Sequence, residues 1–183
     1  MVQDHTLAEQ FQYMGLKNNS VTASSSATVT LGTTDWSTDY NVYMVTLNDV
    51  VPATDDQPLY MKLNKSSDNS TDDTSNYDYT QMTVKTYSAF EENERQDGGR
   101  FKLTDQEIGT ATSETANGTL YLFNFNTASE YSYFTMEMTC FDDDGHLHGN
   151  QGGGVLTVAQ ATNGVTFEMG SGNIASGEFK LYG

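Results

Sequence analysis

The densest group of metal-ligating residue types is the segment Asp142-Asp143-Asp144-Gly145-His146-Leu147-His148. Its aspartates supply the oxygen ligands that calcium takes, six to eight in number, and its histidines supply the imidazoles that transition metals favour. The spacing does not fit an EF-hand loop, because no glutamate stands at its twelfth position, and the two histidines have no third ligand nearby. We therefore expect a solvated acidic hairpin loop and no metal or cofactor. The same interpretation applies to two further acidic groups, Asp68/Asp72/Asp73 and Glu91/Glu92/Glu94.

Histidine and cysteine, which often act as general base and nucleophile, are few, with three histidines and one cysteine in the chain. Cys140 lies on the apolar side of an alternating run, residues 134–140, and is expected to be a buried thiol. The sequence has no Gly-x-Ser-x-Gly elbow, phosphate-binding glycine loop or zinc signature. The 25 acidic residues are too many for the sequence to single out a glycosidase pair. We expect a protein that is not an enzyme.

Aromatic side chains offer a different kind of site, because flat rings can stack on sugar faces. The candidates are Trp36, Tyr77, Tyr79, Tyr131 and Tyr133. Rings at alternating strand positions more often belong to the core or to cross-strand pairs. A host-glycan-binding adhesion module therefore stands as the alternative function.

Charge and composition narrow the possible partners. The 183 residues suit one domain, and the formal net charge of −17 excludes a general nucleic-acid binder, which needs clustered cations. No apolar run approaches the ~20 residues of a membrane span. The start, Met1-Val2-Gln3-Asp4-His5, lacks the basic and apolar regions of a secretory signal. We expect a soluble protein with no nucleic-acid or membrane partner.

The first 20 residues are expected to form an arm with a short helix. Thr6 and Glu9 fit a capping box, and Leu7, Phe11 and Met14 recur on one helical stripe before Gly15. A helix of about eight residues is too short to be stable alone in water. The stripe is therefore expected to dock, either on the rest of this chain or on another protein.

From residue 21 onward the apolar period changes to two, which is typical of half-buried antiparallel strands. Residues 40–47 are apolar on both faces apart from Asn41 and Thr46 and suit a central strand. Residues 178–182 should place Phe179 and Leu181 inward. Asn163-Gly164 is a strong hairpin-turn signal, and Asn117-Gly118 precedes another alternating run. Residues 65–76 and 142–154 are interpreted as long loops. Eight to ten short strands over residues 21–183 predict an all-β fold, either a two-sheet sandwich or a barrel, and of the two we expect the antiparallel two-sheet β-sandwich.

Several segments resemble small β-sandwich virion proteins of tailed bacteriophages, notably those of marine and cyanobacterial phages. The resemblance covers residues 21–183 and is most specific in the ending Gly-Asn-Ile-Ala-Ser-Gly-Glu-Phe-Lys-Leu-Tyr-Gly, residues 172–183. Its other parts are Ala53-Thr54-Asp55 between the runs 40–47 and 59–63, Ser75-Asn76-Tyr77-Asp78-Tyr79, and Leu120-Tyr121-Leu122-Phe123-Asn124.

The resemblance implies a jelly-roll-like domain made in the host cytoplasm and carried on the exterior of a virion. It would serve as a capsid decoration, head fibre or tail component, present in many copies or as a homo-oligomer. Its partners would be other capsid, tail or fibre subunits, and no catalytic residues carry over. Residues 1–20 fall outside the resemblance, so Leu7, Phe11 and Met14 become the candidate partner-anchoring residues.

Overall fold

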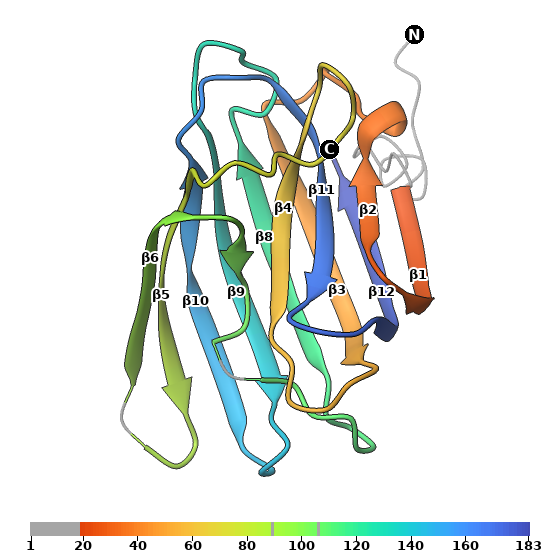
Figure 1. The fold of residues 1–183 in the computed structure, drawn as a ribbon, viewed down its shortest axis with the longest axis vertical. Helices are drawn as coiled ribbons and strands as arrows, with labels where there is room; N and C mark the ends of the chain where they lie inside the picture. The colour runs from red at the N-terminus through yellow and green to blue at the C-terminus, as the bar shows by residue number, and fades with distance from the viewer. Residues whose placement is uncertain (1–18, 89, 106) are drawn as a thin grey trace, which may run out of the picture.

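The computed structural model describes residues 19–88, 90–105 and 107–183, which form twelve β-strands and one short 3-10 helix, η1 (Figure 1). The elements in chain order are β1 (Asn19–Ser26), β2 (Val29–Gly32), η1 (Thr33–Asp35), β3 (Val42–Pro52), β4 (Leu59–Lys65), β5 (Tyr77–Lys85), β6 (Glu91–Gly98), β7 (Phe101–Lys102), β8 (Ala116–Phe123), β9 (Ser132–Phe141), β10 (Leu147–Leu156), β11 (Thr162–Met169) and β12 (Ile174–Tyr182).

These strands form two antiparallel sheets, which confirms the expected all-β, two-sheet architecture. The larger sheet has the order β1-β12-β3-β8-β9-β10-β5-β6, and the smaller has the order β2-β11-β4-β7. Eight strands pair in a nested way: β1 with β12, β2 with β11, β3 with β8 and β4 with β7. The chain passes from one sheet to the other between β1 and β2, between β2 and β3, and between β3 and β4.

The core lies between the sheets and follows from the alternation along each strand. In β9 every second residue is buried, and Phe134, Met136 and Met138 supply the inward side chains. In β12 Phe179 and Leu181 point inward as expected, and the Phe179 ring lies 5.2 Å from that of Phe167 in the opposite sheet. Full burial of each such side chain contributes about 1.5–3 kcal/mol.

Two hairpins extend the larger sheet beyond the nested strands. In Figure 1, β2, β11 and β4 overlie the β12–β3–β8 part of the larger sheet, and β10, β5 and β6 continue it to the left. On the inner side of the extension, the ring of Phe101 packs against two other rings. The ring centroids of Tyr77 and Phe101 are 4.7 Å apart, and those of Phe101 and Phe134 are 4.6 Å apart. The Tyr77 hydroxyl accepts from the Leu63 N–H at 3.2 Å and donates to the Asp72 carbonyl at 2.7 Å. The first hydrogen bond ties β5 to β4 of the smaller sheet.

The prediction of a long loop over residues 142–154 was wrong. The chain turns at residues 142–146 and then enters β10, which pairs with β9 on one side and β5 on the other. The strand could not be recognised in the sequence because the glycines at 149 and 152–154 have no side chains and so show no alternation of apolar and polar residues. A Cβ on Gly154 would lie 2.7 Å from the Phe134 ring and 2.8 Å from the Phe101 ring. Packing against these neighbours explains a glycine in a central strand.

Two further turn signals do not mark turns. Asn163 and Gly164 lie inside β11, where pairing with β4 shifts register between Thr162 and Gly164. A Cβ on Gly164 would lie 2.7 Å from the Leu31 carbonyl oxygen, so close strand approach explains this glycine. Asn117 and Gly118 lie within β8 rather than before it. The polar strand β6 was not expected; its charged residues suit a sheet edge, where they discourage pairing with other chains.

The expected N-terminal helical arm falls almost wholly outside the described residues. β1 begins at Asn19, slightly ahead of the expected domain boundary at residue 21. Within residues 19–88, 90–105 and 107–183, no helix is long and apolar enough to cross a membrane.

Candidate functional site

The outer face of the larger sheet carries exposed apolar and aromatic side chains. Strand register aligns its outward positions into rows. One row crosses the sheet through Tyr182, Met44, Tyr121, Thr135, Gly153 and Thr80. The adjoining row contains Val42, Phe123, Tyr133, Val155 and Asp78. An exposed patch of this kind, rimmed by polar residues, is typical of a binding surface.

Three adjoining hollows lie on this face, one over β9 and two over β10; residues of β10 line all three, and we call them together the β10 groove. The largest, about 630 Å³, has a lining that includes Thr119, Tyr121, Thr135, Glu137 and Gln151. The second, about 400 Å³, is lined by Tyr133, Asp78, Thr80 and Val155, and the third, about 200 Å³, by Met82, Val84, Glu137 and Gln151. Small-ligand sites in proteins measure about 300–1,000 Å³, so the two larger hollows have a suitable size.

Two tyrosines and a hydrogen-bonded polar pair stand at the β10 groove. Tyr121 and Tyr133 are 46% and 43% exposed. Tyr121 pairs with Thr135, so the two tyrosines are diagonal neighbours, with Cα atoms roughly 7–8 Å apart. The Gln151 Nε2 donates to Glu137 Oε1 at 3.1 Å across β9 and β10. The arrangement combines flat apolar surface with fixed hydrogen-bonding groups.

The structure places the five aromatic residues that the sequence suggested as sugar-binding candidates in different environments. Tyr133 lines the β10 groove, and Tyr131, although 42% exposed, precedes β9 and does not line it. Tyr77 is fully buried, and Tyr79 lines the second hollow but packs against the core. Trp36 stacks on Phe125 at 5.4 Å and donates from Nε1 to Asn126 at 2.8 Å, so its ring is occupied within the chain.

Residues 142–146 form a hairpin turn, as expected, but the carboxylate of Asp142 is not solvated. Asp142 and His148 are buried. Asp142 accepts the His146 backbone N–H on Oδ1 and the His148 Nε2–H on Oδ2, both at 2.7 Å. Asp143 and Asp144 are exposed. Among the described residues, no group of three or more His, Cys, Asp or Glu side chains is placed to hold a metal ion.

Asp142→Asn is expected to destabilise the protein by about 1–3 kcal/mol at pH 7, because it disturbs buried charge-assisted hydrogen bonds. Burial alone would raise the pKa of Asp142, but the hydrogen bonds from His146 and His148 outweigh it and hold the pKa below its ordinary value. This stabilisation is therefore present at neutral pH and is lost as pH falls below about 4. Urea unfolding at pH 7 and at pH 3 measures the difference between wild type and variant.

The control for this prediction is Asp143→Asn, which removes the same charge from an exposed neighbour. It should change stability by less than about 0.5 kcal/mol at either pH. An Asp142→Asn protein as stable as wild type at pH 7 would contradict the role given to this carboxylate.

The one cysteine, Cys140, is buried, as expected, close to a group of hydrogen-bonded polar side chains. Cys140 lies directly across from His148 in the β9–β10 pairing, and burial raises the pKa of its thiol to about 12. The thiol is therefore protonated at neutral pH and a poor nucleophile. Nearby, Asn150 Oδ1 accepts from the Thr83 hydroxyl at 3.0 Å and from the Asp105 backbone N–H at 3.1 Å. These contacts fix the segment after β7 onto β5 and β10.

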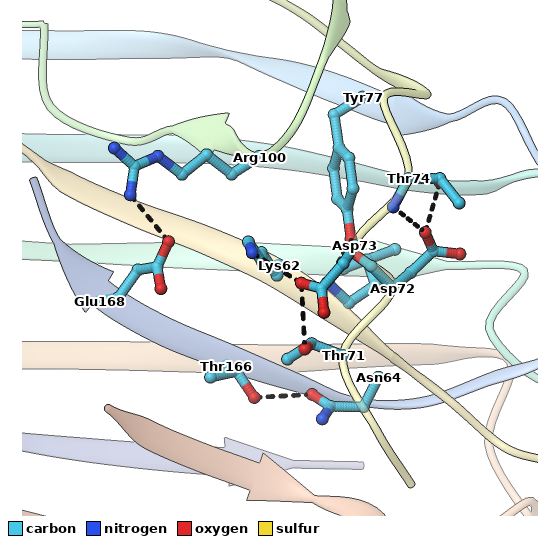
Figure 2. A network of polar contacts seen from close by, with 11 residues as sticks. Lys62, Asn64, Thr71, Asp72, Asp73, Thr74, Tyr77, Arg100, Thr166 and Glu168 are labelled. Carbon is cyan, nitrogen blue, oxygen red and sulfur yellow. Dashed lines mark hydrogen bonds and ion pairs between the residues drawn. The ribbon is translucent and has the colours of Figure 1, made fainter. Parts of the chain in front are cut away.

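The outer side of the smaller sheet carries a network of ion pairs and hydrogen bonds (Figure 2). Lys62 pairs with Asp73 at 2.7 Å, and Arg100 pairs with Glu168 at 2.8 Å. Arg100 also lies 3.6 Å above the Tyr60 ring. The acidic group Asp68/Asp72/Asp73 belongs to this region: Asp68 pairs with Lys65, and Asp72 accepts the Thr74 N–H at 2.9 Å. These acids stabilise the β4–β5 connection.

In the acidic group on β6, the first residue, Glu91, forms an ion pair. Glu91 pairs with Lys85, whose side chain is largely buried. Glu92 and Glu94 lie opposite Met82 and Thr80, at the edge of the outer face.

Sequence reasoning did not find the β10 groove, and its candidate anchors Leu7, Phe11 and Met14 lie outside the described residues. The groove depends on register between strands far apart in sequence, such as β8 with β9 and β10 with β5. The available signal was the glycine run at 152–154 next to alternating aromatic strands. No family model, curated protein or solved structure matches this chain.

Proposed function

We propose that this chain is a non-enzymatic structural protein on the exterior of a tailed-phage virion, assembled in many copies by protein–protein contacts. The observation that carries the proposal is the nested strand pairing: first with last, second with second last, and so on inward. That pairing is the order of a jelly roll, here with hairpins β5–β6 and β9–β10 added to one sheet. Jelly rolls build viral capsid and lectin domains.

The resemblance of the sequence to phage virion proteins favours the capsid-type reading of this fold. Its most specific segment, residues 172–183, contains β12, which lies between β1 and β3 inside the larger sheet. Gly172 and Gly177 within it have φ angles of 72° and 146°, which side-chain-bearing residues rarely adopt. The segment therefore combines a central strand with backbone conformations that need glycine.

Charge and side-chain chemistry support contact rather than catalysis on the particle exterior. The ionisable side chains that meet in the described part of the chain, such as Asp142 with His148 and Arg100 with Glu168, hold turns and strands in place. The net charge of −17 would repel packaged DNA, so an outer position costs less electrostatic free energy.

Attachment to the particle is proposed to use the apolar side chains of Leu7, Phe11 and Met14. Leu7→Asp combined with Phe11→Asp is expected to remove most of the protein from purified particles, because the charges must be desolvated on docking. Quantitative mass spectrometry of particles measures the change. The control, Gln10→Asp with Gln12→Asp, adds the same charge between these positions and should leave incorporation unchanged. Equal incorporation of both double variants would refute the anchor.

A further inference from the structure

We infer that the β10 groove binds an oligosaccharide that is neutral or carries amino groups. This function goes beyond particle attachment and does not depend on it, because the groove lies on described strands and the proposed anchor residues precede β1. A head or tail protein with such a groove could contact glycans on a host surface.

The tyrosines supply the apolar part of the site. A sugar ring presents C–H groups on its faces and hydroxyl groups around its rim, so it is recognised by a flat ring with polar groups beside it. Tyr121 and Tyr133 are half exposed on adjoining strands, and each lines a different one of the two larger hollows. Tyrosine provides large contact area at low entropic cost because its side chain has only two rotatable χ angles. The two rings can therefore contact two different sugar units.

The polar lining matches the rim of a sugar. Gln151 and Glu137 are held by their mutual hydrogen bond, and Thr119 and Thr135, which carry hydroxyl groups, line the same hollow. Amide, carboxylate and hydroxyl groups together offer both donors and acceptors, which sugar hydroxyls require. A few fixed polar groups among apolar ones are typical of specific small-molecule sites.

Electrostatics selects the class of sugar. The residues lining the three hollows include the carboxylates Glu137 and Asp78 and no lysine or arginine. An anionic glycan would bring its charge next to these carboxylates without a cation among the lining residues to compensate. A neutral glycan avoids this cost, and an amino sugar gains attraction.

Glycines shape the groove and make it elongated. Gly153 lines the second hollow and Gly149 the third, and at these outward positions of β10 they carry no side chains to fill the space; the largest hollow adjoins them over β9. Flanking strands β9 and β5 carry larger outward residues, among them Tyr133 and Met82. Adjoining hollows over β9 and β10 suit a chain of several sugars better than a single one.

The test uses the full chain on an array of bacterial surface glycans that includes neutral, amino-bearing and anionic structures. The strongest ligand is then titrated by calorimetry against wild type, Tyr121→Ala, Tyr133→Ala and Tyr131→Ala. Tyr131 is a matched control, because its exposure of 42% equals that of Tyr133 within one percentage point and it does not line the groove. Circular dichroism and thermal melting confirm that all variants are folded.

We expect selective binding of neutral or amino-bearing glycans. Tyr121→Ala and Tyr133→Ala should each weaken it by about tenfold or more, equivalent to 1.4 kcal/mol, and Tyr131→Ala by less than twofold. Absence of binding across the array, preference for anionic glycans, or equal effects of all three substitutions would overturn the inference. Binding of a protein partner at the groove with no glycan binding would also overturn it. Particle attachment is measured separately, so its failure leaves these outcomes unaffected.

Discussion

Gly152→Val is expected to leave the protein without a cooperative folded state. A Cβ at this position would lie 2.3 Å from the Thr80 carbonyl oxygen and 2.7 Å from the Gln81 Cα, both backbone atoms of β5. Backbone cannot move aside as a flexible side chain can, so β10 and β5 must separate. The predicted loss exceeds about 4–5 kcal/mol, a large part of the total stability of a typical domain. Urea unfolding followed by tryptophan fluorescence and circular dichroism measures it.

A control is Gly99→Ala, because a Cβ on Gly99 meets no atom within 4 Å apart from its neighbours in the chain. Its stability should stay within about 0.5 kcal/mol of wild type. A Gly152→Val protein that unfolds cooperatively with near-normal stability would show that the β10–β5 pairing is looser than the structure indicates. It would also weaken the description of the β10 groove, whose sides depend on that pairing.

Tyr77→Ala is expected to lower stability by about 3–5 kcal/mol, the range for removing a large buried aromatic side chain. Tyr77 is fully buried, and its ring packs against Phe101 at 4.7 Å under the extension of the larger sheet. The substitution also removes a hydroxyl that bridges Leu63 and Asp72. Chemical denaturation at pH 7 gives the difference in the free energy of unfolding.

Tyr77→Phe separates the two contributions, because it keeps the ring and removes the hydroxyl. It should cost about 1–3 kcal/mol, since the Leu63 N–H and Asp72 carbonyl lose a buried partner. Tyr131→Ala removes an exposed tyrosine and should be nearly neutral. If Tyr77→Ala costs no more than Tyr131→Ala, the aromatic packing beneath the added hairpins does not stabilise the fold as proposed.

Strands with side chains of alternating character could be predicted from sequence. β9 alternates buried and exposed residues along its whole length, and β12 places Phe179 and Leu181 inward. Period-two patterning depends only on local residues and a buried face, so it also predicted the two-sheet fold class. Cys140 was assigned correctly because it occupies the buried phase of the β9 pattern.

Elements governed by distant packing could not be predicted. β10 was missed because its glycines have no side chains and so show no alternation of apolar and polar residues. Glycine is needed at position 154 because a Cβ there would collide with the ring of Phe101, which is far away in sequence. β6 was missed because an edge strand of charged residues resembles a loop. Asn163-Gly164 is typical of a turn by its residue types, but it lies inside β11, where β2 approaches closely at Leu31 and leaves no room for a Cβ on Gly164.

The candidate site was predicted only in fragments. Tyr133 was among the aromatic candidates, but its partnership with Tyr121, Glu137 and Gln151 follows from strand order and register. Asp142 and His148 were recognised as a cluster, and their burial depends on packing that the sequence does not reveal. Local patterns thus indicate which strands form, and tertiary pairing decides which outward residues meet.

The location of this chain in purified virions tests the central proposal most directly. If the proposal holds, mass spectrometry and cryo-electron microscopy of purified particles of the source phage would give the copy number and position of the chain. We predict many copies with a two-sheet β-sandwich density on the outside of the head or tail. Absence of the chain from purified particles, or a position inside the head against packaged DNA, would contradict the account.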